Sequence, residues 1–268
     1  MIDADKLNTL LHYMKGAEHF SYSFEGLTRG SSRWCPFTHR GGGVDCDCYR
    51  THQGVQAILA WTGKYLQCVR FLDVDRYRLD DMSGVLLQLS APEQIADHAE
   101  FRGLLDRMRD GIKFIEPTIV KKLERVACTE CVRLDEAAVC FSNYCFTASV
   151  AMAVSAVEYR LVELIRRKNE RLYRSSFARS TLGQLIQVFD DTQYKDKKYA
   201  AIKKLMPQKH KPLLALLNQY RVFSVHPKGE TITPQIAESI LHLAFAFVLD
   251  EAACPYREGA LKCGGVLA

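Results

Sequence analysis

The sequence predicts a mainly α-helical protein whose C-terminal half is an antiparallel helical bundle. From about residue 121 onward, apolar residues recur at helical spacing in one segment after another. Residues that start or stop helices separate these segments, as Thr233-Pro234 does before the last one. The connections are short, which favours antiparallel neighbours. Residues 1–120 lack a uniform pattern and predict a mixed or irregular, mostly helical region.

In the N-terminal region, periodicity predicts helices over residues 6–24, 55–72 and 93–109, the last ending at Gly111. Residues 85–89 could form a short strand. The stretch 26–49 is rich in Gly, Ser and Cys, which indicates irregular structure. Nothing in these patterns indicates a role for the region.

The C-terminal helical domain is predicted over residues 121–255, followed by a Gly-rich tail over 256–268. Its first four helices are expected over residues 134–145, 147–173, 181–189 and 199–205. The next is marked by Leu213, Leu216, Leu217 and Tyr220, and the last by Ile236, Ile240, Leu243, Ala244, Phe247 and Val248. In the long helix, an apolar face is formed by Val150, Val154, Val157, Leu161 and Leu164. A stripe about a quarter turn away holds Arg160, Arg167, Arg171 and Arg174.

Composition limits the class of protein. At 268 residues and 48% hydrophobic, the chain can bury a sizeable core. It has no run of about twenty apolar residues, so no membrane partner is expected. The start is acidic where a secretory signal is basic, which predicts a cytoplasmic protein. In that reducing setting the ten cysteines are expected to be thiols or metal ligands.

Positive charge is concentrated in one region. The net charge of the chain is +5, but residues 157–211 hold 14 Lys and Arg against 6 Asp and Glu, a net of +8. A local basic field of this kind attracts phosphate backbones, which makes RNA a candidate partner. A solubilising face with no partner would have the same composition, and both interpretations remain open.

Arg221 and His226 are the candidate catalytic pair. They lie between two predicted amphipathic helices, and Pro227 should make the chain leave the first helix at His226. A permanently charged guanidinium beside a side chain that titrates near neutral pH suits phosphate chemistry. The spacing alone is weak, because 20 Arg and 8 His in this chain produce about two such pairs by chance.

The helices around this pair resemble a known family. Residues 134–148 run into an Ala-rich helix that carries Glu158, and the chain then reaches Arg221, His226 and a last amphipathic helix. This order resembles the HEPN superfamily, the "higher eukaryotes and prokaryotes nucleotide-binding" helical domain. The resemblance covers residues 120–255 and none of the N-terminal half.

The resemblance implies a metal-independent endoribonuclease that acts as a homodimer. His226 would act as general base or acid for attack of a ribose 2′-hydroxyl on the adjacent phosphate, and Arg221 would stabilise the developing charge. Two copies of the motif would form one cleft. RNA would be guided there by Arg160, Arg167, Arg171, Arg174 and Lys228. Family members are often toxins or antiviral effectors, so a protein regulator or antitoxin is a further candidate partner.

One residue departs from the family pattern. The position after the arginine is usually polar in active members, and here it is Val222. Ser224 could take over the missing polar role. The alternative is a non-catalytic adaptor that dimerises and binds RNA or protein through the same helical domain.

A separate cluster suggests a structural metal. Cys35, His39, Cys46 and Cys48 fall within fourteen residues, and three thiols with one imidazole could close a tetrahedral zinc site. Their spacing matches no common zinc ribbon, so free thiols in a loop are the alternative. No cofactor is expected for the proposed cleavage itself.

Overall fold

The structure is a computed structural model. It describes residues 60, 63, 66, 67, 69–91, 94, 98–123, 125–189, 194–225 and 231–255. Within these residues every regular element is a helix, which confirms the predicted mainly α fold. The chain divides into two compact units, Ile2–Val120 and Lys121–Ala268. The predicted helix 6–24 and most of the predicted helix 55–72 lie outside the described residues.

In the first unit, α4 (Arg76–Leu89) is capped by Asp75, whose Oδ1 accepts a hydrogen bond of 3.0 Å from the Arg78 backbone N–H. The prediction of a strand over residues 85–89 is wrong, because this segment is the end of α4. Val85 and Leu89 are buried at helical spacing after Met82. A short apolar run has the same composition in a buried helix as in a strand.

Helix α5 (His98–Leu123) runs through the predicted stop at Gly111 and also contains Pro117. The glycine serves packing instead of ending the helix. A Cβ at Gly111 would lie 2.6 Å from Cγ of Met82, so the missing side chain lets α4 and α5 approach closely. An ion pair between Arg107 and Asp81 links the same two helices.

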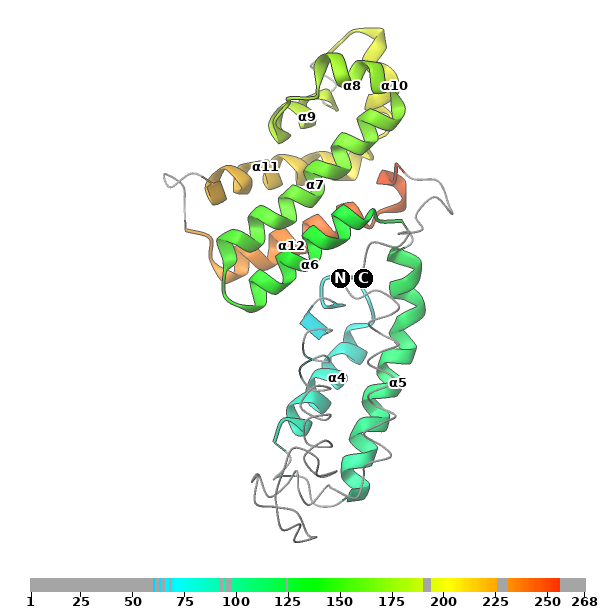
Figure 1. Ribbon diagram of the computed structural model, residues 1–268, viewed down its shortest axis with the longest axis vertical. Coiled ribbons are helices and arrows are strands. Elements are labelled where there is room, and N and C mark those ends of the chain that lie inside the picture. Colours follow the sequence, from blue (N-terminus) through cyan, green and yellow to red (C-terminus); the bar gives the residue numbers. More distant parts are fainter. Residues whose placement is uncertain are drawn as a thin grey trace, which may run out of the picture. The chain divides into compact units, whose positions relative to one another are not determined.

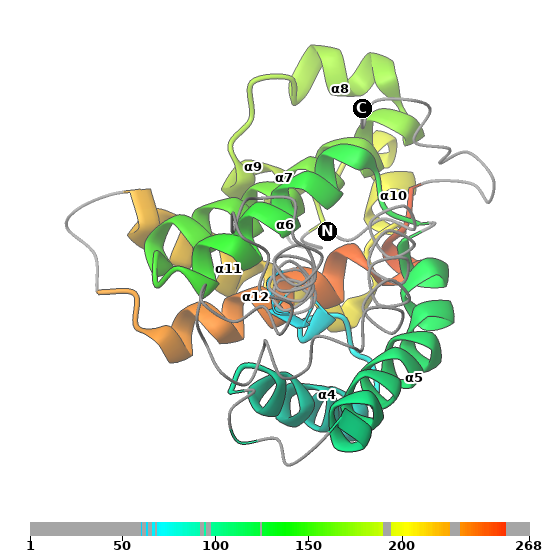
Figure 2. The same cartoon turned by 60° about the horizontal axis from the view of Figure 1, so that its bottom comes forward.

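The second unit is built around four helices, α6 (Cys128–Ser142), α7 (Phe146–Lys168), α11 (Lys211–Val225) and α12 (Pro234–Val248). Helix α7 packs against the other three, and α12 also contacts α6 and α11. The α6–α7 turn, the end of α11 and the start of α12 lie at the same end of the bundle in both views (Figures 1 and 2).

The predicted core of the bundle is largely confirmed. All five apolar positions expected on α7 are buried, and α12 buries Ile240, Ala244, Phe247 and Val248. The start of α12 is also as expected, with Pro234 in the first turn and Thr233 Oγ1 accepting from the Ile236 N–H at 3.3 Å. On α11 the prediction is partly wrong, because Leu214 and Leu217 face the core while Leu216 is exposed.

Short helices continue from the far end of α7. The predicted helix 147–173 breaks at Asn169, whose extended backbone separates α7 from α8 (Glu170–Ser176). The Asn169 side chain caps α8 by accepting from the Leu172 N–H at 3.0 Å. The chain continues through α9 (Leu182–Val188), α10 (Lys197–Lys203) and the 3₁₀ turn η3 (Gln208–His210), and η4 (Glu251–Ala253) follows α12. Helices α8 and α10 lie at the end of the unit away from the α6–α7 turn (Figure 1).

None of the helices in the described part of the chain combines the length and hydropathy that a bilayer-spanning segment requires.

Candidate nucleic-acid interface

Arg221 lies four residues before Val225, the last described residue of α11. The prediction that Pro227 makes the chain leave the helix at His226 concerns residues outside the described part of the chain. The Nε atom of Arg221 is 3.9 Å from Oε2 of Glu158 on α7, and the two side chains are 31% and 30% exposed. A pair this long and this accessible to water contributes little to stability. Arg221 is therefore lightly held and within reach of a ligand.

The neighbours of Arg221 do not supply the polar group that the family pattern has there. Val222 is 40% exposed and has no polar atom in its side chain. The Ser224 hydroxyl donates a hydrogen bond of 2.8 Å to the carbonyl oxygen of Arg221. Its proton is thus used within the helix and is not directed at the Arg221 guanidinium.

His226 and Lys228 lie outside the described residues, as do the four predicted zinc ligands Cys35, His39, Cys46 and Cys48. These remain predictions from the sequence. Among the residues that the structure does describe, no group of three or more His, Cys, Asp or Glu side chains is arranged to hold a metal ion.

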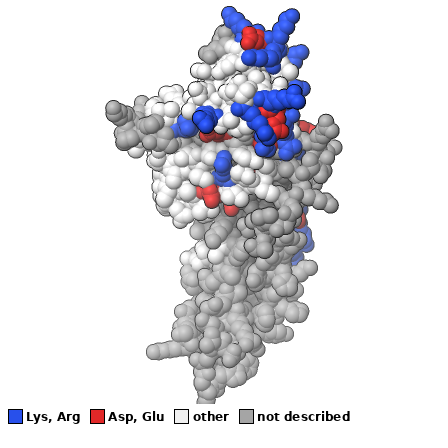
Figure 3. Space-filling view, turned by 45° about the horizontal axis from the view of Figure 1, so that its top comes forward, with Lys and Arg blue, Asp and Glu red and all other residues white. Residues whose placement is uncertain are grey.

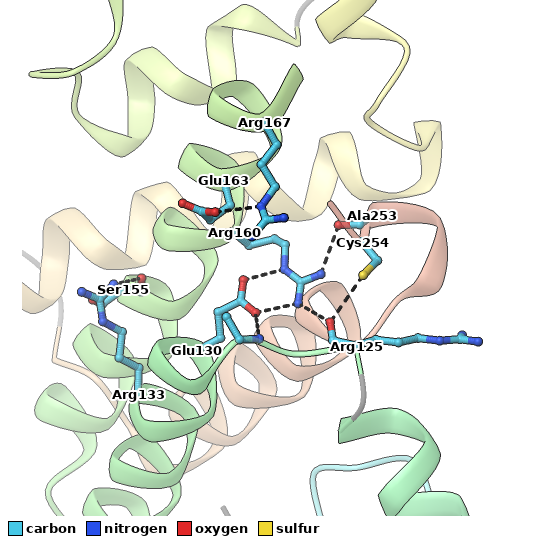
Figure 4. A network of polar contacts seen from close by, with 10 residues as sticks. Arg125, Glu130, Arg133, Ser155, Arg160, Glu163, Arg167, Ala253 and Cys254 are labelled. Atoms are coloured by element: carbon cyan, nitrogen blue, oxygen red, sulfur yellow. Dashed lines mark hydrogen bonds and ion pairs between the residues drawn. The ribbon is translucent and has the colours of Figure 1, made fainter. Parts of the chain in front are cut away.

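Arg160 corrects the predicted RNA-binding stripe. Its side chain is fully buried, so it cannot contact RNA on the surface. The guanidinium forms two hydrogen bonds of 2.7 Å with the carboxylate of Glu130, which is also fully buried. It also donates to the carbonyl oxygens of Arg125 and Ala253 at 3.1 and 3.3 Å. This network joins the start of α6, the middle of α7 and η4 (Figure 4).

Glu130 has a second structural role. Its Oε2 accepts a hydrogen bond of 2.8 Å from the Ala127 backbone N–H, which satisfies one free donor at the start of α6. A buried charge of this kind is tolerated only when it is paired and fully hydrogen-bonded. The Arg160–Glu130 pair therefore belongs to the core. The sequence placed Arg160 about a quarter turn from the apolar face of the helix, and that offset is the same for the surface arginines of the stripe.

The other three arginines of the stripe are exposed, as the prediction requires. Two of them have acidic neighbours one turn away. Arg167 forms a hydrogen bond of 3.1 Å with Glu163, and Arg174 one of 2.7 Å with Glu170. For Arg171 the described residues supply no acidic partner within 4.0 Å.

Exposed cations without an acidic partner among the described residues gather near Arg171. We call them the cationic surface, and its members are Lys168, Arg171, Arg179, Lys195, Lys197 and Lys204. Lys and Arg side chains crowd the end of the unit that carries α8 and α10 (Figure 3). Because none of these six cations has an acidic partner among the described residues, they are available to phosphate groups.

The structure also reveals a pair that the sequence did not indicate. His210 is buried, and its Nε2 lies 2.6 Å from Oδ2 of Asp250, forty positions later in the chain. Burial would raise the pKa of Asp250, but hydrogen bonds from Lys209, the Ala252 N–H and His210 outweigh it and lower the pKa to about 2. The pair joins η3 to the residue that precedes η4, and no local pattern could have predicted it.

Comparison of the chain with protein-family models, with curated proteins and with solved structures finds no match.

Proposed function

We propose that residues 121–255 form a HEPN-type helical domain that binds RNA and cleaves it without a metal ion. The observation that carries the proposal is the position of Arg221. It is half-buried and loosely paired near the C-terminal end of α11, five positions before His226 in the sequence. The cationic surface of the same domain supports an RNA substrate, because phosphate contacts supply most of the affinity in sequence-independent binding.

The proposed reaction uses both side chains. His226 removes the proton from a ribose 2′-hydroxyl, and the O2′–P bond forms as the P–O5′ bond breaks. A proton returned to O5′ leaves one product with a 2′,3′-cyclic phosphate and another with a 5′-hydroxyl. Arg221 stabilises the additional negative charge on the phosphoryl oxygens.

Glu158 would have to give up Arg221 when a phosphate arrives. A carboxylate 3.9 Å away that is 30% exposed is a weak competitor, since water screens the pair. A phosphate can accept two parallel hydrogen bonds from a guanidinium, which a contact through Nε alone does not provide. Exchange of Glu158 for phosphate is therefore favourable in this geometry.

The test is incubation of labelled RNA in EDTA with the wild type and the variants Arg221→Ala and His226→Ala. Gln219→Ala, an exposed position on the same helix, is the control. Removal of a general acid–base group typically lowers the rate by about 10²–10⁴-fold. Cleavage by the wild type and the control, with loss in both variants, supports the proposal. Equal cleavage by all four proteins, or none by any, contradicts it.

The second candidate function is a non-catalytic adaptor, and exposed Val222 is the observation that favours it. An adaptor would bind RNA through the cationic surface but leave it intact. A gel-shift measurement on the same samples separates the two functions, because binding without cleavage in the wild type identifies the adaptor.

A role as a toxin or antiviral effector is the biological extension of the nuclease proposal. Expression of the wild type should then arrest cell growth, and expression of His226→Ala should not. A protein regulator or antitoxin would be recovered as the factor that relieves the arrest.

A further inference from the structure

The turn between α6 and α7 brings two cysteines together. Helix α6 ends at Ser142, and Tyr144 then adopts a left-handed φ of 60°. The Tyr144 N–H donates a hydrogen bond of 3.0 Å to the carbonyl oxygen of Phe141. The Cys145 N–H donates one of 2.9 Å to the carbonyl oxygen of Cys140. These two bonds form a Schellman motif, in which the side chains of the residues joined by the outer bond commonly contact each other. Here both of those side chains are thiols.

The backbone separation of Cys140 and Cys145 suits a disulfide. An N–H···O bond holds neighbouring backbones about 5 Å apart, and a disulfide spans Cα atoms about 4.4–6.8 Å apart. Two side chains five positions apart in a continuous helix would instead point about 140° away from each other around its axis. The reversal of the chain at Tyr144 therefore creates the proximity. Both thiols are free in the structure.

The two thiols differ in their surroundings. Cys145 is exposed, whereas Cys140 is half-buried. Burial raises the pKa of the Cys140 thiol, and the neighbouring Cys145 and Glu136 raise it further. The Cys145 Sγ donates to the Asn143 carbonyl oxygen at 3.5 Å, and because an S–H group is a weak donor, this bond is easily given up. Cys145 is thus the thiol that a small oxidant reaches first, and Cys140 is placed to react second.

We propose that Cys140 and Cys145 are a redox-active pair that hydrogen peroxide converts to a disulfide. In the first step the Cys145 thiolate attacks one peroxide oxygen. The S–O bond forms, the O–O bond breaks, and the leaving hydroxide takes up a proton to become water. The Cys140 sulfur then attacks the sulfur of the Cys145 sulfenic acid. The S–S bond forms, the S–O bond breaks, and a second water leaves with the Cys140 proton. The two thiols lose two electrons, which reduce one peroxide to two waters.

The place of the pair in the fold gives the disulfide a consequence. It would tie the last turn of α6 to the start of α7, the helix that packs against α6, α11 and α12. A cross-link restricts the unfolded chain more than the folded one, so the oxidised protein should be the more stable form. Because the turn lies at one end of the bundle and Cys145 is exposed, a thiol reductant can reach the bond and reverse it (Figure 1). None of this depends on RNA cleavage.

The experiment treats the full chain with hydrogen peroxide after reduction with dithiothreitol and removal of the reductant. The peroxide dose is one that oxidises free glutathione, and the remaining thiols are alkylated. Chymotrypsin cuts after Phe141 and Tyr144, so the two cysteines fall in different peptides that only a disulfide can join. We expect mass spectrometry of the wild type to find these two peptides joined, and to find them separate after dithiothreitol.

Cys131→Ser, on the same helix as Cys140, is the matched control. Burial raises the pKa of Cys131 to about 11, which keeps this thiol inert, so the variant should form the same joined peptides as the wild type. Cys140→Ser should leave a sulfenic acid on Cys145 that dimedone labels. Cys145→Ser should leave Cys140 unlabelled. Oxidation should raise the Tm of the wild type and of Cys131→Ser but not that of the two turn variants.

Wild-type peptides that stay separate after the peroxide treatment overturn the proposal, and this result needs no variant. Joined peptides that contain Cys131 in place of Cys140 also overturn it. Equal dimedone labelling of Cys140 in one turn variant and of Cys145 in the other contradicts the assigned order of reaction. An oxidised wild type with an unchanged Tm contradicts the stabilising role of the disulfide.

Discussion

The two ends of α7 differ in charge, although they belong to one helix. Its first half, from Phe146 to Val157, has no charged residue, and its last turn ends in Arg166, Arg167 and Lys168. The uncharged half begins at the α6–α7 turn, and the charged end leads into α8 and the cationic surface. The difference teaches that one continuous helix can separate an uncharged region from a strongly basic one.

Arg160 lies between these two halves and belongs to neither region. Its charge is neutralised inside the unit by Glu130, so the transition along α7 passes through a buried ion pair (Figure 4). The uncharged half, the charged end and the buried pair can each be altered by separate substitutions, so each can be tested by itself.

The largest expected effect comes from the buried pair. Arg160→Met should lower the free energy of unfolding by about 3–5 kcal/mol, because it leaves the Glu130 carboxylate buried without its partner. The double variant Arg160→Met, Glu130→Met should recover most of the loss. Urea denaturation measures both. A single variant as stable as the wild type would show that Arg160 is not a core residue and would return it to the surface stripe.

The next effect concerns the charged end. Replacing Lys168, Arg171 and Lys204 with Gln should weaken RNA binding by about 50-fold near physiological salt and reduce the slope of log K against log salt by about 2. The matched control replaces Arg76, Lys113 and Lys121 with Gln. These residues are exposed on other helices, and their replacement removes the same net charge. Fluorescence anisotropy over a salt series compares the two triple variants. Equal losses would mean that net charge alone, and not the cationic surface, attracts RNA.

A smaller effect is expected in acid. The pKa of Asp250 falls from 3.8 to about 2 in the folded protein, so its stabilising contribution is complete above pH 4 and is lost as the pH falls toward 2. Asp250→Asn should lower stability at pH 7 by about 2 kcal/mol and flatten the stability profile in that window. Denaturation at a series of pH values tests this. An unchanged profile would contradict a stabilising role for the hydrogen bonds that Asp250 accepts from Lys209, the Ala252 N–H and His210.

The smallest effect is at the uncharged end. Tyr144→Gly should raise the free energy of unfolding by about 1 kcal/mol, because glycine adopts the left-handed conformation without a Cβ clash. Thermal unfolding of the variant and the wild type at the same low protein concentration measures it. A destabilised variant would show that the Tyr144 ring supports the fold, although the side chain is 82% exposed.

The sequence predicted features that depend on neighbours within a few residues. The Thr233 cap of α12 and the buried face of α7 are local patterns, and both are confirmed. The prediction of a strand over residues 85–89 was wrong because a short apolar run does not show whether its period is that of a strand or a helix. The prediction that a helix ends at Gly111 was wrong because this glycine makes room for Met82, which lies in another helix.

The candidate site depends on partners that are distant in the chain. Glu130 and Arg160 are thirty positions apart, and His210 and Asp250 are forty apart, so no spacing rule could pair them. The contact of Arg221 with Glu158 is of the same kind, because it requires α7 and α11 to pack side by side. The roles of His226, Lys228 and the predicted zinc ligands stay predictions from the sequence.

The most direct test of the central claim uses two substrates of the same sequence, an RNA and a strand that carries 2′-deoxyribose at every position. Each is incubated with the wild-type protein in EDTA. Attack by the ribose 2′-hydroxyl predicts cleavage of the RNA alone, with 2′,3′-cyclic phosphate and 5′-hydroxyl ends on the products. Cleavage of both strands, or products with 5′-phosphate ends, would contradict the mechanism assigned to Arg221 and His226.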